Sequence, residues 1–194
     1  MRQILLALLL AIAACGPKAD HEVREAVLED YIDAVNRNDV GDALALHTPD
    51  AEFLIPGQNL IRGTEAMRSL LQWDSVLGSH IRIAPLEWRG DTLVVGAGAE
   101  RNAWLSGIGI DSIQYASGTR FVFDGNRIRG VYASTLQPQS LAEFVAKFSE
   151  FSAWADTMAP EVARLAPDGL FRYDAAAAES WLAVLKRYRT EGRR

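Results

Sequence analysis

The chain has 194 residues, of which 49% are hydrophobic and 23% are charged, a composition typical of one globular domain with an appendage. The net charge is -5, and the only dense basic run, from Lys186 to Arg194, lies at the chain end, where it is typical of a solvated helix tip. This pattern argues against nucleic acid as a partner.

The first fourteen residues are typical of an export signal. Arg2 is followed by an unbroken apolar run, Ile4 to Ala14. The run is well short of the roughly 20 residues that cross a bilayer as a helix, and it ends in small residues. We therefore exclude residues 1–14 from the fold.

Cys15 is the only cysteine of the chain, so an internal disulfide is excluded. The run Ile12-Ala13-Ala14-Cys15 is similar to the lipobox of bacterial lipoproteins. That resemblance implies a lipidated Cys15 that anchors the protein to a membrane of the bacterial cell envelope, facing the periplasm, with residues 15–21 as a tether. In such lipoproteins, a residue other than Asp directly after the cysteine is often associated with the outer membrane. Here that residue is Gly16. The alternative is an ordinary cleaved signal with an incidental cysteine.

The residues after the tether predict helices and one strand. Apolar side chains recur at three- and four-residue steps over residues 22–38, which predicts an amphipathic helix. Asp39 can cap a short second helix. A strand is expected over residues 51–55, and a third helix over residues 64–77 with Thr64 as its cap.

From Ser79 onward the apolar pattern alternates, which predicts strands. Asp124-Gly125-Asn126 is a strong hairpin signal between the last two of them. The expected strands are 80–88, 93–105, 113–123 and 127–135.

Several motifs together carry a resemblance to a known family. They are the helix end Asn36 to Asp39, the strand entry Pro49 to Phe53, Gly63 before a helix, and the hairpin Phe121 to Ile128. In this order and spacing, residues 22–136 resemble the nuclear transport factor 2-like superfamily and, within it, the SnoaL-like proteins. The resemblance implies an α+β fold: a cone-shaped, curved antiparallel sheet wrapped on the N-terminal helices, with a pocket in its mouth.

Residues 137–194 predict a C-terminal helical extension beyond that family's minimum. Ser140 to Glu143 has the pattern of a capping box, Pro160 ends or kinks the first helix, and Asp174 caps the last one. Both helices carry apolar stripes that must be covered in water. We expect them to pack on the outer face of the sheet or on each other; the alternative is a second protomer in a homodimer.

Metal and cofactor motifs are missing from the sequence. His21, His47 and His80 have no ligand spacing among themselves and no cysteine beside them, so no protein-held metal is predicted. The chain also lacks the patterns of a P-loop, a dinucleotide fingerprint or a nucleophile elbow. We expect no cofactor.

The resemblance supplies a test for catalysis. Ketosteroid isomerases of this fold have an Asp-Pro near the end of the first strand, and this chain has Ile55-Pro56. Their oxyanion hole uses a phenol, which matches Tyr31, and a protonated acid, which matches Thr119, a hydroxyl that cannot do the same work. Isomerase chemistry by that route is therefore not expected. An Asp–Arg–Asp trio that activates water and a paired-histidine site are not evident either.

Glu100 is the one carboxylate in an otherwise apolar strand, with Trp104 on the same predicted face. Inside the cone it would be a candidate acid or base; the alternative, which we favour, is a sheet-surface Glu paired with Arg101 or Arg120. The residues expected to line a ligand pocket are Tyr31, Ile55, Trp73, Glu100, Trp104, Thr119 and Phe121.

The sequence favours a membrane-anchored lipoprotein whose cone binds a small apolar ligand or a partner without catalysis. The missing strand-end carboxylate is the reason. One alternative is an enzyme of the lyase, isomerase or hydrolase type that uses Glu100 or Tyr31 in the cone. Another is an assembly protein whose C-terminal helices dock on an envelope partner.

Overall fold

The computed structural model describes residues 17–192, so the predicted signal peptide and Cys15 lie outside the described residues. The helices are α1 (Pro17–Asn36), α2 (Val40–Ala45), α3 (Thr64–Leu77), α4 (Ala103–Ile108), α5 (Pro138–Met158), α6 (Val162–Leu165) and α7 (Ala175–Glu191), with the 3-10 turn η1 (Pro167–Gly169). The strands are β1 (His47–Leu54), β2 (Ile61–Arg62), β3 (His80–Arg89), β4 (Thr92–Arg101), β5 (Ile113–Tyr115), β6 (Thr119–Asp124) and β7 (Arg127–Tyr132).

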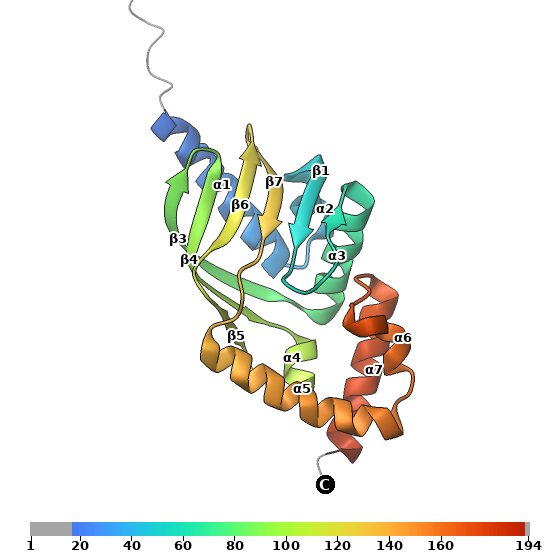
Figure 1. Cartoon of the computed structure of the whole chain (residues 1–194). Helices are drawn as coiled ribbons and strands as arrows, with labels where there is room; N and C mark the ends of the chain where they lie inside the picture. Colours follow the sequence, from blue (N-terminus) through green and yellow to red (C-terminus); the bar gives the residue numbers. More distant parts are fainter. Residues whose placement is uncertain (1–16, 193–194) are drawn as a thin grey trace, which may run out of the picture.

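The strands form one curved sheet in the order β2-β1-β7-β6-β4-β3, with β5 paired to β4 (Figure 1). Every pairing is antiparallel except that of β1 with β7, which is parallel. The α+β cone is thus confirmed, but the expected purely antiparallel sheet is wrong at this pair. Parallel neighbours need a long crossover, and here α3 and the rest of the meander provide it.

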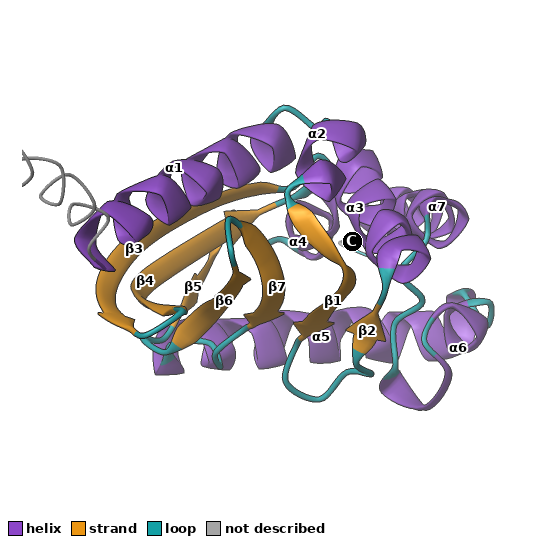
Figure 2. Cartoon of the chain, turned by 90° about the horizontal axis from the view of Figure 1, so that it is seen from above, coloured by secondary structure: helices purple, strands orange, loops and turns teal. Residues whose placement is uncertain are grey.

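Helix α1 lies along the curved sheet over β3 and β4 (Figure 2). Its apolar face packs against the sheet, because Leu28, Tyr31 and Val35 share one buried cluster with side chains of β4, β6 and β7. Burying each side chain of this size is worth about 1.5–3 kcal/mol. This cluster is the core of the cone.

Two expected strands are shorter than the sequence pattern suggested. The strand predicted over 93–105 ends at Arg101, because the Asn102 side chain accepts a hydrogen bond from the backbone N–H of Leu105 (2.9 Å) and so caps α4. The strand predicted over 113–123 is divided into β5 and β6. Gly118 between them has a φ of +115°, which a β-strand does not continue through.

Three predicted helix starts also need correction. Helix α1 begins at Pro17, so it runs into the predicted tether 15–21. Thr64 is not a cap, since its hydroxyl donates to the Pro49 carbonyl oxygen at 3.2 Å instead. The capping box at Ser140 is wrong as well: α5 begins at Pro138, and the Ser140 hydroxyl accepts a hydrogen bond from the backbone of β5. The Asp174 cap of α7 is confirmed, by a 2.8 Å bond from the Ala177 N–H.

The extension does not cover the outer face of the sheet as expected. Helices α5 and α7 pack on each other and on α3 and α4, at the end of the sheet where β5 lies (Figure 1). They go there because Trp73 of α3 and Trp104 of α4 offer apolar surface at that end. Phe151 and Trp181, both 0% exposed, form the centre of this second core. The expected packing of the two helices on each other is confirmed.

One side of α5 stays uncovered. Leu141 and Val145 are 46% and 54% exposed. A homodimer that covers them stays a prediction. Within residues 17–192, none of the helices has the length and apolarity needed to cross a membrane.

We expect Trp181→Ala to lower the free energy of unfolding by about 3–5 kcal/mol, because it removes the largest fully buried side chain of the second core. Urea unfolding followed by circular dichroism measures this loss. Glu179→Ala, an exposed change on the same helix, is the control and should stay within about 0.5 kcal/mol of the wild type. A similar loss in both variants would contradict the packing described for α7.

Candidate functional site

A cavity of about 240 Å³ lies between the sheet, α1, α3, α4 and the extension. Its walls are largely apolar and aromatic. All the side chains that the sequence predicted for the pocket line this cavity: Tyr31, Ile55, Trp73, Glu100, Trp104, Thr119 and Phe121. Their contact with a ligand stays a prediction.

The extension closes part of this cavity. Phe171, in the connection between η1 and α7, packs edge-on against Trp73 and Trp104, with ring centroids 6.1 Å and 5.5 Å apart. Phe144 of α5 also lines the cavity. Because these side chains come from residues after 137, the pocket is not built by the predicted SnoaL-like segment alone.

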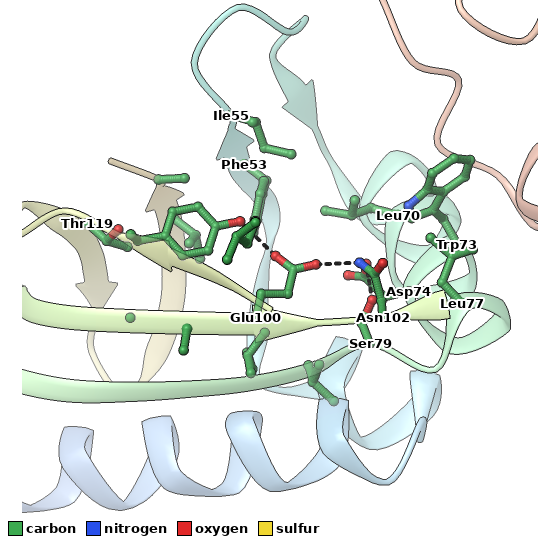
Figure 3. Close-up of a pocket in the computed structure, with 18 of the residues that line it drawn as sticks. Phe53, Ile55, Leu70, Trp73, Asp74, Leu77, Ser79, Glu100, Asn102 and Thr119 are labelled. Atoms are coloured by element: carbon green, nitrogen blue, oxygen red, sulfur yellow. Dashed lines mark hydrogen bonds between the residues drawn. The ribbon is translucent and has the colours of Figure 1, made fainter. Parts of the chain in front are cut away.

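Glu100 reaches into the cavity from β4 (Figure 3). Its carboxylate accepts hydrogen bonds from the Tyr115 hydroxyl (2.7 Å) and the Asn102 amide (2.8 Å). The favoured pairing with Arg101 or Arg120 is therefore wrong. Arg101 follows Glu100 in the strand and so points to the other face of the sheet, while Arg120 lies over the Tyr132 ring.

A second carboxyl group, Asp74 of α3, faces the same cavity beside Asn102 and Ser79 (Figure 3). The Ser79 hydroxyl donates to it at 3.1 Å. Sequence reasoning missed Asp74, and the signal was its position: it follows Leu70 by four residues and precedes Leu77 by three, on the buried face of α3. A lone carboxyl in an apolar helical stripe has to be explained by a partner or a role.

The two carboxyl groups have unequal environments. Burial, together with the charge of Glu100, raises the pKa of Asp74 from its ordinary 3.8 to about 8. Burial also raises the pKa of Glu100, but the hydrogen bonds from Tyr115 and Asn102 oppose this rise by stabilising its charge. Within the described residues no Lys or Arg forms an ion pair with either group. Asp74 is therefore the member of the pair that favours its protonated form at neutral pH, and Glu100 is the member whose charge is stabilised by neighbouring hydrogen bonds.

Tyr31 and Thr119 differ in what they can offer a ligand. The Tyr31 hydroxyl has no hydrogen-bond partner among residues 17–192, and burial raises the pKa of this phenol, so it remains a neutral donor. The Thr119 hydroxyl is hydrogen-bonded to the Ser134 side chain (3.0 Å) and accepts from the Ser134 backbone (3.0 Å). The Thr119 hydroxyl is thus already hydrogen-bonded within the protein, where it links β6 to the residues that follow β7.

Of the residues that the structure describes, the three histidines are not among those that line the cavity. His21 stacks on Trp88 near the start of α1, with ring centroids 4.4 Å apart. His47 is buried against Tyr31, donates a hydrogen bond from Nδ1 to the Ala43 carbonyl oxygen (2.9 Å), and has a pKa lowered by burial. In the part of the chain that the structure describes, no three His, Cys, Asp or Glu side chains are grouped as a metal site.

No family model matches the sequence, and no curated protein matches it either. Solved structures do match. The epoxide hydrolase/cyclase-like enzyme SalBIII superposes with a TM-score of 0.54 at 16% identity, over 62% of this chain and 95% of its own. An LEH-like epoxide hydrolase from M. tuberculosis superposes with a TM-score of 0.52 at 16% identity, over 68% of this chain and 96% of its own.

A nuclear transport factor 2-like protein from Burkholderia xenovorans LB400 also matches, with a TM-score of 0.48 and 20% identity over 63% of this chain and 95% of its own. This chain has the nuclear transport factor 2-like fold, because its curved sheet is wrapped on the N-terminal helices as the resemblance implied. The superpositions with TM-scores of 0.54 and 0.52 support the same fold. At such identities the nuclear transport factor 2-like cone is shared, whereas its chemistry depends on the residues in the pocket.

The raised pKa of Asp74 predicts how stability depends on pH. Between about pH 4 and pH 8 the folded protein keeps a proton on Asp74 that the unfolded chain has released, so this group's contribution is present below pH 4 and is lost as the pH rises through 8. Between pH 5 and pH 9 we expect the free energy of unfolding of Asp74→Asn to rise relative to that of the wild type by on the order of 4 kcal/mol, about 1.4 kcal/mol for each of the three pH units below 8.

Urea unfolding at both pH values measures this difference. Asp156→Asn, at an exposed position on α5, is the control and should keep a constant difference from the wild type. A constant difference for Asp74→Asn as well would show that Asp74 titrates normally in the folded protein.

Proposed function

We propose that the cavity is an active site for acid–base chemistry on a small, largely apolar substrate, and that the substrate class is an epoxide. The observation that carries the proposal is the pair of carboxyl groups in one apolar cavity: the raised pKa of Asp74 favours its protonated form, and hydrogen bonds from Asn102 and Tyr115 stabilise the charged form of Glu100. We assign Asp74 as the acid and Glu100 as the base. Pairs of acids whose environments separate their pKa values divide the roles of acid and base.

The reaction follows from these protonation states. Glu100 accepts a proton from water, and the water oxygen attacks one carbon of the epoxide ring. The bond from that carbon to the ring oxygen breaks, and its electron pair goes to the oxygen. Asp74 donates the proton that turns this oxygen into a hydroxyl, which gives a diol. Transfer of a proton from Glu100 back to Asp74 restores the starting pair.

Two further observations support an epoxide over a ketosteroid-like substrate. The strand-end acid of the ketosteroid isomerases is replaced by Ile55. The Thr119 hydroxyl, at the position of their protonated acid, is hydrogen-bonded to Ser134, so the oxyanion hole of those isomerases is not assembled. Of two matching structures with TM-scores of 0.54 and 0.52, one is an epoxide hydrolase/cyclase-like enzyme with a role in pyran ring formation, and the other is an LEH-like epoxide hydrolase. This second support is an analogy of fold.

We expect Asp74→Asn and Glu100→Gln each to lower kcat by about 10²–10⁴-fold, because each removes one of the two proton transfers. Hydrolysis of cyclohexene oxide, styrene oxide and 1,2-epoxyoctane by the purified protein measures this. Glu150→Gln, which breaks an exposed ion pair with Lys147, is the control and should leave kcat unchanged. A kcat for epoxide hydrolysis that is unchanged in both Asp74→Asn and Glu100→Gln would contradict the proposal.

Binding of an apolar ligand without catalysis is the second candidate, and the largely apolar lining of the cavity favours it. The expectation of a non-catalytic cone came from the missing strand-end carboxylate. That carboxylate is still missing, but Asp74 and Glu100 come from other elements. Binding of apolar ligands with no turnover of any epoxide in the wild type would favour this candidate.

The envelope location is also a proposal, supported by the apolar N-terminal run and the lipobox-like residues that end at Cys15. In this arrangement acyl chains on Cys15 anchor the protein, and the cone faces the periplasm.

We expect Cys15→Ser to abolish labelling by a radioactive fatty acid and to move the protein out of the membrane fraction, because the thiol is the site of acylation. Labelling in a bacterial host, followed by fractionation, measures both. Ser152→Ala, far from the N-terminus in α5, is the control. Unchanged labelling of Cys15→Ser would contradict the lipid anchor.

A further inference from the structure

We propose that Tyr173, in the C-terminal extension, donates a hydrogen bond to the oxygen of the bound ligand beside Asp74, so that the extension completes the site. This inference rests on the proposed function, since it assigns a second donor to the same substrate oxygen. It concerns a residue of the connection between η1 and α7, which the sequence did not single out.

This connection is tied to the cone by one side chain. The Gln58 amide, in the loop between β1 and β2, donates to the Gly169 carbonyl oxygen (3.2 Å) and accepts from the Phe171 backbone N–H (2.8 Å). Asp174 then caps α7. Residues 169–174 are therefore held at both ends, over the cavity.

The Tyr173 ring is fixed against α3, the helix that carries Asp74. It packs edge-on against Trp73, the residue before Asp74 in α3, with ring centroids 5.5 Å apart. Tyr173 lines the cavity, yet its hydroxyl has no hydrogen-bond partner within residues 17–192. A partly buried phenol without a partner has a donor available for a ligand.

The charge of the site supports the same role. Burial, with the nearby Asp74 and Glu100, raises the pKa of Tyr173, so its hydroxyl keeps its proton at any physiological pH. Tyr115 differs, because its hydroxyl is already donated to Glu100. Tyr173 and protonated Asp74 can thus serve one ligand oxygen together, while Tyr115 and Asn102 serve the base.

The test compares two ligands of nearly the same shape, 2-butyltetrahydrofuran and butylcyclopentane, which differ by an ether oxygen in place of a CH₂ group. The ether cannot be opened like an epoxide, so binding is measured without turnover. Fluorescence of Trp73 and Trp104, which line the cavity, reports the Kd of each ligand. The quantity compared is the ratio of the ether Kd to the hydrocarbon Kd.

We expect Tyr173→Phe to raise this ratio about tenfold over the wild type, because one hydrogen bond to the oxygen is lost while the ring stays in place. Tyr188→Phe is the matched control, since Tyr188 lies on the same extension but packs on Phe151 and Trp154 away from the cavity. Its ratio should stay within about twofold of the wild type.

An unchanged ratio in Tyr173→Phe would overturn the inference, and so would an equal loss of affinity for both ligands, which would reduce Tyr173 to a packing role. If Asp74→Asn still abolished epoxide turnover in that case, the proposed function would stand without Tyr173. A wild-type protein that binds neither ligand would overturn both the inference and the choice of this cavity as the site.

Discussion

The structure depends on keeping two carboxyl groups in an apolar cavity, where neither forms an ion pair with a Lys or Arg of the described residues. Two negative charges in such surroundings repel strongly and lose their hydration, so the favourable state has one proton on the pair. Asn102 and Tyr115 stabilise the charge on Glu100, and Asp74 keeps the proton. The chemical character of the cavity, one donor opposite one acceptor, follows from this uneven division.

Helix α3 links this constraint to the rest of the molecule. Leu71 packs in the core of the cone, Trp73 packs in the core shared with the extension, and Asp74 faces the cavity between them. The position of Asp74 therefore depends on both cores. Packing of α7 on α3 and α4 sets the shape of the pocket through Trp73 and Trp104, which line it.

The shared fold leaves room for a different chemistry. The isomerase-like acid at the strand end is absent, and Thr119 is bound to Ser134. An acid instead comes from α3, and aromatic side chains from the extension close the cavity. A fold of this type positions side chains from many elements around one pocket, so loss of an acid from one element can be balanced by an acid on another.

Local patterns in the sequence determined the α3 helix over 64–77, the hairpin at Asp124-Gly125-Asn126 and the Asp174 cap, because these depend on neighbouring residues alone. The alternation of side chains along β4 puts Glu100 and Arg101 on opposite faces, which the favoured pairing with Arg101 did not take into account, and the sequence did not say which face lies inside the cone. Only the tertiary structure decided that. Docking of α3 and α4 brings Asp74 and Asn102 to Glu100, across separations in sequence that no local pattern spans.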